Sequence, residues 1–232
     1  MHTVKGLYEL KQKPNLSKIS LELLLKYYEQ YLKPYRFTYT LSNGRTVNLT
    51  FEDEKFCHLL GIETVAIKKY KRKSHLTSPY KSVKGYRRIK EGKLTFKSLK
   101  QLEPNGFKSI KDKIIFFYLI PHILESPEII IDYVQDPSVS LVNCKLMIFE
   151  LLHGVYVHLG IEIEKGNAYF PRTFLVERIT VKNDGTRFIA NQPNLITIEK
   201  IEKSYVSNGE IISTIYPQKA KEISDSESEP QK

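Results

Sequence analysis

The chain has 232 residues, 41% of them hydrophobic, which allows one large folded core and excludes disorder along the whole length. The formal net charge of +10 favours polyanionic partners such as nucleic acid. Cys57 and Cys144 are too few for a disulfide framework or a zinc site, and residues 1–13 lack the apolar run of a signal peptide, so we expect a cytoplasmic protein with reduced thiols.

The first half of the chain predicts a helix and a β-hairpin. Apolar residues recur at helical spacing from Ser17 to Leu32, and Pro34 ends the pattern. Alternating runs follow at 35–41 and 45–51, on either side of Ser42-Asn43-Gly44. Such a turn between alternating runs predicts a hairpin.

A short helix is predicted next, from a capping box formed by Thr50 and Asp53 to Gly61 just past its end. Residues 68–103 are basic and partly helical, Asn105-Gly106 breaks the pattern, and 107–120 predicts a long central helix. The longest apolar run, 114–124, is too short to cross a bilayer, so we expect no membrane partner.

The positive charge is concentrated in one segment. Residues 68–100 hold 13 Lys and Arg against one acid, Glu91, so this segment carries +12 and the rest of the chain about −2. Such a segment attracts polyanions, and tyrosines among its cations favour nucleic acid, since they can stack on bases. The alternative is a solvated surface that only keeps the protein soluble. The residues predicted to bind RNA are Lys71, Arg72, Lys84, Tyr86, Arg87 and Arg88.

From about residue 145 the pattern changes to period two. Four strand-like segments, at 145–152, 154–164, 167–179 and 194–206, predict a four-stranded antiparallel sheet after the helices, and hence an α+β fold. The end of the chain is polar, serine-rich and acidic, which predicts disorder. The domains expected are an N-terminal helical segment (1–34), a main domain (35–216) with a basic insertion at about 68–100, and a disordered tail (217–232).

One histidine stands out in the stretch "EKFCHLLGI". On a helix, His58 lies about 200° from Phe56 and therefore away from the apolar face, while Glu54 lies on the same side as His58, close enough to orient the imidazole. This geometry leaves two interpretations open: a surface histidine without a function, or a histidine free to do chemistry.

The segment "YFPRTFLVER" contains a proline that cannot donate to a β-ladder, so Pro171 predicts an edge strand or a bulge. A bulge would turn Arg172 and Thr173 toward one space, where with Tyr169 they offer a cation and two hydroxyls to a phosphate. The alternative is an edge strand with an exposed arginine. The chain has no Walker loop, GxGxxG, HExxH or nucleophile elbow, which disfavours nucleotide-dependent enzymes, zinc proteases and serine hydrolases.

Three stretches in this order, "FEDEKFCHLLGI", "FKSIKDKIIFFYLIPHIL" and "AYFPRTFLVERI" followed by "NLITIEKIEK", resemble a known family. They are similar to the phage-linked barnase–EndoU–colicin E5/D–RelE-like (BECR) nucleases, most closely to their fourth subfamily, from about residue 35 to 205. The resemblance implies a helical section followed by a four-stranded antiparallel sheet. It also implies a metal-independent ribonuclease without a cofactor, encoded by phages and mobile elements and acting as a toxin or in host conflict.

The resemblance also suggests roles for individual residues. His58 would be the general base or acid, held by Glu54, and Arg172 with Lys113 or Lys111 would stabilise the charge on phosphorus. Tyr169 and Thr173 would position the phosphate, although Thr173 stands where serine is as frequent in the family.

Two other functions remain open at this point. The first is a nucleic-acid-binding accessory protein with the same fold and without catalysis. A third interpretation is a structural protein whose basic segment binds an acidic antitoxin or inhibitor protein, or its own acidic tail.

Overall fold

The computed structural model describes residues 1–71, 73–138 and 142–217. Arg72, predicted to bind RNA, and 218–232 of the predicted disordered tail lie outside the described residues. The helices are α1 (Val4–Tyr8), η1 (Leu16–Lys18), α2 (Leu21–Tyr31), α3 (Asp53–Leu59), α4 (Ile62–Tyr70), α5 (Ser74–Thr77), η2 (Ser78–Tyr80), α6 (Ser82–Lys90), α7 (Phe96–Leu102), α8 (Pro104–Ser109), α9 (Lys111–Phe116), η3 (Phe117–Leu119) and α10 (Ile120–Glu125). The strands are β1 (Tyr35–Leu41), β2 (Thr46–Leu49), β3 (Ile129–Asp132), β4 (Leu146–Leu152), β5 (Val155–Lys165), β6 (Ala168–Arg178), β7 (Leu195–Tyr205) and β8 (Ile211–Ile215).

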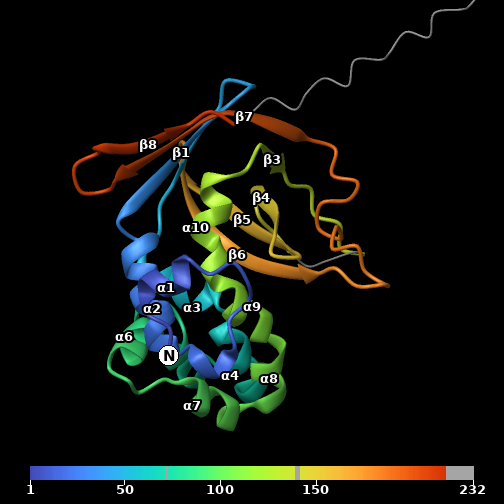
Figure 1. Cartoon of the computed structure of the whole chain (residues 1–232). Coiled ribbons are helices and arrows are strands. Elements are labelled where there is room, and N and C mark those ends of the chain that lie inside the picture. The colour runs from blue at the N-terminus through green and yellow to red at the C-terminus, as the bar shows by residue number, and fades with distance from the viewer. Residues whose placement is uncertain (72, 139–141, 218–232) are drawn as a thin grey trace, which may run out of the picture.

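The strands form a closed barrel. Across the described residues, seven strands pair in the order β1-β2-β6-β5-β4-β3-β7, and β7 pairs back onto β1. β8 adds an eighth strand to the edge of β7, and β2 with β6 is a parallel pair among otherwise antiparallel ones. Figure 1 shows the strands in the upper half of the molecule, with most of the helices gathered below them.

The predicted four-stranded antiparallel sheet is therefore wrong, although the α+β class and the four predicted strands are present. The strand at 195–205 does not continue the meander from β6. It pairs instead with β3 and with β1, so that the N-terminal hairpin lies between β7 and β6. Ring closure pairs the edges that an open four-stranded sheet would leave free, and this is its physical advantage.

The predicted central helix is broken into four short pieces, α8, α9, η3 and α10. Its expected break at Asn105-Gly106 is instead inside α8, where Gly106 packs against Val65. Pro121 lies in the first turn of α10, the helical position where a missing N–H costs nothing. The chain thus changes direction while keeping Phe117, Tyr118 and their neighbours fully buried.

Aromatic packing attaches the helix that carries His58 to the barrel. The centroid of the Phe56 ring of α3 lies 5.1 Å from that of Tyr28 of α2 and 5.7 Å from that of Phe117. The ring centroids of Phe117 and Phe174 of β6 are 6.3 Å apart. Ring pairs at these separations are favourable beyond the area that they bury. α3 is therefore held in a fixed position over β6 by the common core.

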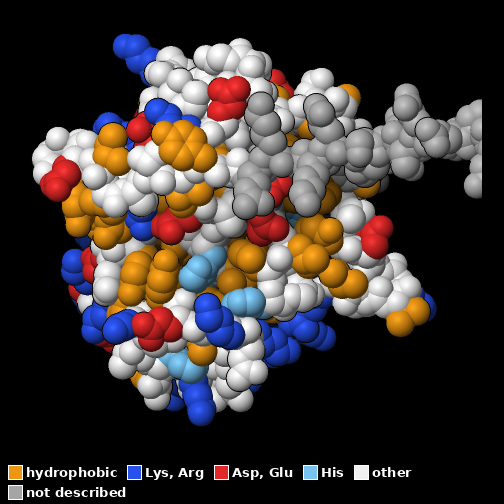
Figure 2. Space-filling view, turned by 45° about the horizontal axis from the view of Figure 1, so that its top comes forward, with side chains coloured by type: hydrophobic (Ala, Val, Ile, Leu, Met, Phe, Trp, Pro, Cys, Tyr) orange, Lys and Arg blue, Asp and Glu red, His pale blue; other side chains and the backbone are white. Residues whose placement is uncertain are grey.

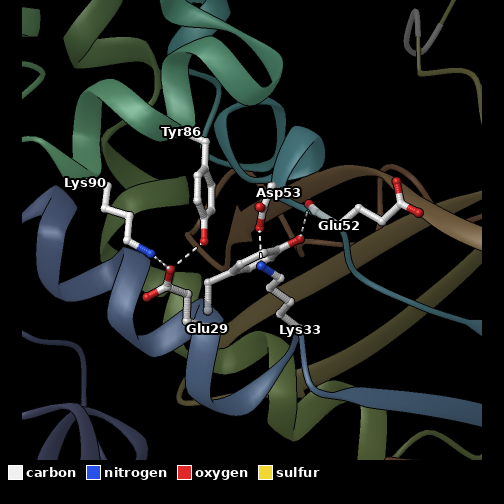
Figure 3. A network of polar contacts seen from close by, with 7 residues as sticks. Glu29, Lys33, Glu52, Asp53, Tyr86 and Lys90 are labelled. Carbon is white, nitrogen blue, oxygen red and sulfur yellow. Dashed lines mark hydrogen bonds and ion pairs between the residues drawn. The ribbon is translucent and has the colours of Figure 1, made fainter. Parts of the chain in front are cut away.

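The basic segment is part of this core and packs on α3 and α2. At Gly85 of α6 a Cβ atom would lie 2.7 Å from Sγ of Cys57, so glycine allows α6 to approach α3 closely. The Tyr86 hydroxyl donates to Glu29 Oε1 at 2.6 Å, and Lys90 Nζ lies 3.0 Å from the same oxygen (Figure 3). In Figure 3, Lys33 pairs with Asp53 at 2.7 Å, which ties the end of α2 to the start of α3.

None of the helices in the described residues has the length and apolar character needed to cross a lipid bilayer.

Candidate functional site

A cavity of about 200 Å³ lies between α3, the start of α4, the start of α6 and strand β6. It combines positive, negative and aromatic side chains in one small space. Its walls are formed by Glu54, Lys55, His58, Glu63, Ser82, Phe170, Pro171 and Arg172. The cavity thus brings together site residues that were predicted from two separate parts of the sequence, namely His58 with Glu54, and Arg172.

A β-bulge places Arg172 at the cavity. In the pairing of β5 with β6, Gly160 opposes Thr173 and Ile161 opposes Pro171, so Arg172 is the extra residue. The bulge expected at Pro171 is confirmed. A bulged residue bends its strand and redirects its side chain. Arg172 accordingly has no partner on β5, and its side chain lines the cavity.

The imidazole of His58 is half-exposed and faces a carboxylate. Its Nδ1 lies 3.6 Å from Glu63 Oε1, an ion-pair separation, whereas Glu54 is paired with the adjacent Lys55. The interaction with His58, followed by the charges of Lys81 and Arg172, holds the pKa of Glu63 below its usual range. Glu63 is therefore ionised at neutral pH and lies among three cationic or ionisable groups.

Two further predicted residues do not line the cavity. Tyr169 is buried in the core, and the guanidinium of Arg45 hydrogen-bonds both Tyr169 and Asp132, which raises the pKa of Arg45. Thr173 is half-buried opposite Gly160, where a Cβ would lie 2.8 Å from the threonine methyl group. Both residues belong to β6 and lie outside the lining of the cavity.

Lys113 of α9 lies behind the turn that ends α3. Its Cδ would be 3.5 Å from a Cβ at Gly61, and its ammonium forms no ion pair or hydrogen bond with any described residue. Burial lowers the pKa of Lys113 to about 8. Its neighbour Lys111 is exposed on the same helix.

The predicted RNA-binding residues of the basic segment divide into two groups. Lys71, Lys84 and Arg87 are exposed and form no ion pair within the described part of the chain. Tyr86 is 4% exposed and donates to Glu29, so its ring is not presented for stacking, while Arg88 lies 5.2 Å from the Tyr80 ring and holds η2 against α6. Figure 2 shows several Lys and Arg side chains along the lower margin of the molecule, at the end formed by the helices.

Five lining residues were not predicted as part of a site, namely Lys55, Glu63, Ser82, Phe170 and Pro171, although Pro171 was expected to mark a bulge. The signal for Glu63 was present at Gly61, whose φ of +74° turns the chain between α3 and α4 and returns Glu63 toward His58. Phe170 lies in the same segment as Arg172, but no local signal gives it a role in a site. Ser82 comes from a distant segment, and nothing local in the sequence marks it. Among the described residues, no three His, Cys, Asp or Glu side chains gather in a way that would hold a metal ion.

The fold and the cavity together define an α+β protein with a histidine, two carboxylates and an arginine in one site, the groups used for proton transfer and charge stabilisation at an anionic centre. The model of a nuclease family, described as phage-Barnase-EndoU-ColicinE5/D-RelE like nuclease 4, matches residues 24–229. The chain belongs to this family, as the resemblance of its motifs predicted, and a nucleic acid is accordingly its class of substrate. No curated protein and no solved structure shows a significant match to the chain.

Proposed function

We propose that this nuclease is an endoribonuclease that cleaves RNA by attack of the 2′-hydroxyl on the adjacent phosphorus, without a metal ion. The observation that carries the proposal is the convergence of His58 and Arg172, from α3 and the bulge of β6, on one cavity. In this reaction the 2′-hydroxyl loses its proton as the O2′–P bond forms, the P–O5′ bond breaks, and the leaving O5′ takes up a proton. One product strand ends in a 2′,3′-cyclic phosphate and the other begins with a 5′-hydroxyl.

His58 is the proton-transfer group of the proposed site. Because its Nδ1 faces Glu63, Nε2 is the ring nitrogen left for the substrate. Glu63 orients the ring in this proposal, and Glu54, the residue expected in that role, lines the same cavity beside Lys55. A proton-transfer group so placed contributes about 10²–10⁴-fold to the rate.

Arg172 supplies the positive charge for the oxygens on phosphorus in the transition state. A guanidinium can donate two parallel hydrogen bonds to a phosphate, which a lysine cannot reproduce. We propose that Lys113 adds positive charge from behind the turn at Gly61, and that Tyr169 and Thr173 position Arg172 through strand β6. The family resemblance is the support for a toxin or host-conflict role; growth of cells expressing the wild type, compared with an inactive variant, tests this part.

The test is incubation of the purified protein with RNA in EDTA. We expect the wild type to leave cyclic phosphate ends, His58→Ala to lose at least 100-fold in rate with RNA binding kept, and Glu63→Gln to lower kcat. His75→Ala is the matched control, because His75 is an exposed histidine of the basic segment that does not line the cavity.

Intact RNA with the wild type, together with undiminished binding, would reject the enzyme and identify a nucleic-acid-binding accessory protein. Cleavage by His58→Ala at the wild-type rate would remove His58 from the mechanism. Salt-sensitive binding of an acidic protein in place of RNA would instead indicate an antitoxin-type or inhibitor partner.

A further inference from the structure

The ring of Phe170 is placed unusually for a phenylalanine. It is half-buried and lines the cavity beside His58 and Arg172, yet within the described residues it belongs to neither of the two buried apolar clusters. It also pairs with no other aromatic ring there. The ring therefore contributes little to the core and forms the apolar part of an otherwise polar wall.

The contact that Phe170 does form is with a cation of α3. Lys55 Nζ lies 4.0 Å from the centroid of the ring and is also paired with Glu54. An ammonium at this distance over a ring is a favourable cation–π contact. The contact places one face of the ring against Lys55 of the helix that carries His58.

The backbone sets the spacing between this ring and the phosphate-binding residue. Phe170 and Arg172 are two residues apart, about 7 Å along an extended strand, with the buried Pro171 between them. Both side chains line the cavity, whereas Phe174, beyond the bulge, is fully buried against Phe117. A nucleotide presents a charged phosphate and a flat base at a comparable separation, and this wall offers a cation and a flat ring.

We propose that Phe170 is a stacking platform for an unpaired nucleobase next to the phosphate bound by Arg172, so that the site takes single-stranded RNA. This inference rests on the proposed ribonuclease function and deepens it. Every base has an aromatic face, so stacking selects unpaired bases with little preference for sequence. In a duplex both faces of each base are covered by its neighbours, and the base must leave the helix before it can lie on Phe170.

The decisive variant is Phe170→Leu, which keeps an apolar side chain of similar volume and removes the aromatic face. With a single-stranded oligonucleotide we expect KM to rise about 5- to 100-fold with kcat unchanged, because stacking stabilises the bound substrate and the transition state alike. Phe170→Trp should restore the wild-type KM, and the wild type should cleave the same sequence in a duplex at least tenfold more slowly. An unchanged KM in Phe170→Leu, or equal cleavage of duplex and single strand by the wild type, would overturn the inference.

Binding of a probe that cannot be cleaved separates this inference from the proposed function. A single strand with 2′-deoxyribose throughout lacks the attacking hydroxyl, so its Kd is measurable by fluorescence anisotropy whether or not the protein cleaves RNA. A Kd for Phe170→Leu weakened 5- to 100-fold supports the platform, and an unchanged Kd rejects it. Thermal unfolding of the variant should match the wild type, since the ring lies outside the buried clusters.

Discussion

His58 shows how far helix geometry leads from sequence to function. Its position opposite Phe56 on α3 predicted an imidazole outside the core, and the side chain is 46% exposed. The same geometry favoured Glu54 as its partner, but the nearest carboxylate is Glu63. Helical angles hold only while the helix continues, and α3 ends at Leu59, so the position of Glu63 depends on the left-handed turn at Gly61.

His158 of β5 illustrates the opposite environment. It is fully buried among Phe149, Tyr156 and Phe188. Burial, followed by the charge of Arg187, lowers the pKa of His158 to about 4, and the Leu175 backbone acts in the other direction. The folded protein therefore keeps this imidazole neutral over a pH range in which the unfolded chain protonates it.

This difference predicts a specific acid sensitivity. The unfolded histidine has its ordinary pKa of about 6.5. The contribution of the neutral His158 to the free energy of unfolding is thus fully present above pH 6.5 and is lost as the pH falls toward 4. The loss is about 2–3 kcal/mol. His158→Leu should lose less stability across that window, as measured by urea unfolding at pH 7 and pH 4.5. Parallel losses in both proteins would assign the acid sensitivity to other groups.

At the scale of single elements, strand β6 shows the limit of alternation as a guide. A regular strand would place Phe170, Arg172 and Phe174 on one face, and Pro171 signalled a bulge without marking the extra residue. Because Arg172 is that residue, Phe174 is buried in the core while Phe170 lines the cavity. One inserted residue reverses the faces of everything after it, and the sequence does not indicate on which side of the proline this happens.

Helix α6 depends on close packing against α3, and Gly85 is the residue that permits it. Gly85→Ala would place a Cβ 2.8 Å from the carbonyl carbon of Tyr80, a backbone atom that cannot rotate away. We expect a net loss of about 1–2 kcal/mol in the free energy of unfolding, since overpacking exceeds the gain in helix propensity. Lys84→Ala, at an exposed neighbouring position, should change stability by less than about 0.5 kcal/mol. Denaturant unfolding of both variants measures this, and equal stabilities would show that α6 shifts without cost.

At the scale of the whole molecule, the α+β class and most strands follow from sequence patterns, but the barrel does not. β3 has only four residues, and the strands that close the ring are far apart in the chain. Strand patterns report which residues are buried and carry no information about which distant edge each strand meets. The same limit applies to the cavity. The sequence predicted site residues on α3 and on β6 separately, but it did not predict that the two elements meet.

The distribution of charge predicts how the whole protein binds RNA. Replacing Lys71, Lys84 and Arg87 by Gln removes three exposed, unpaired cations of the described basic segment. Each phosphate contact contributes about −0.7 to the slope of log Kobs against log salt for a single strand, so the slope should become shallower by about 2. A control variant in which Gln replaces Lys13, Lys18 and Lys182 loses the same charge outside that segment. Its slope should be nearly that of the wild type. Equal slopes for the two triple variants would mean that RNA does not follow the basic segment.

The pairing of β1 with β7 also has a consequence for synthesis of the protein. Tyr35 of β1 pairs with Tyr205 of β7. The barrel therefore cannot close until β7 has been synthesised. Contacts between residues so distant in the chain form late and slow folding. The cavity has the same requirement, because α3 is translated long before β6. A nascent chain on the ribosome, surrounded by RNA, therefore has no assembled site until strand β6 has been synthesised.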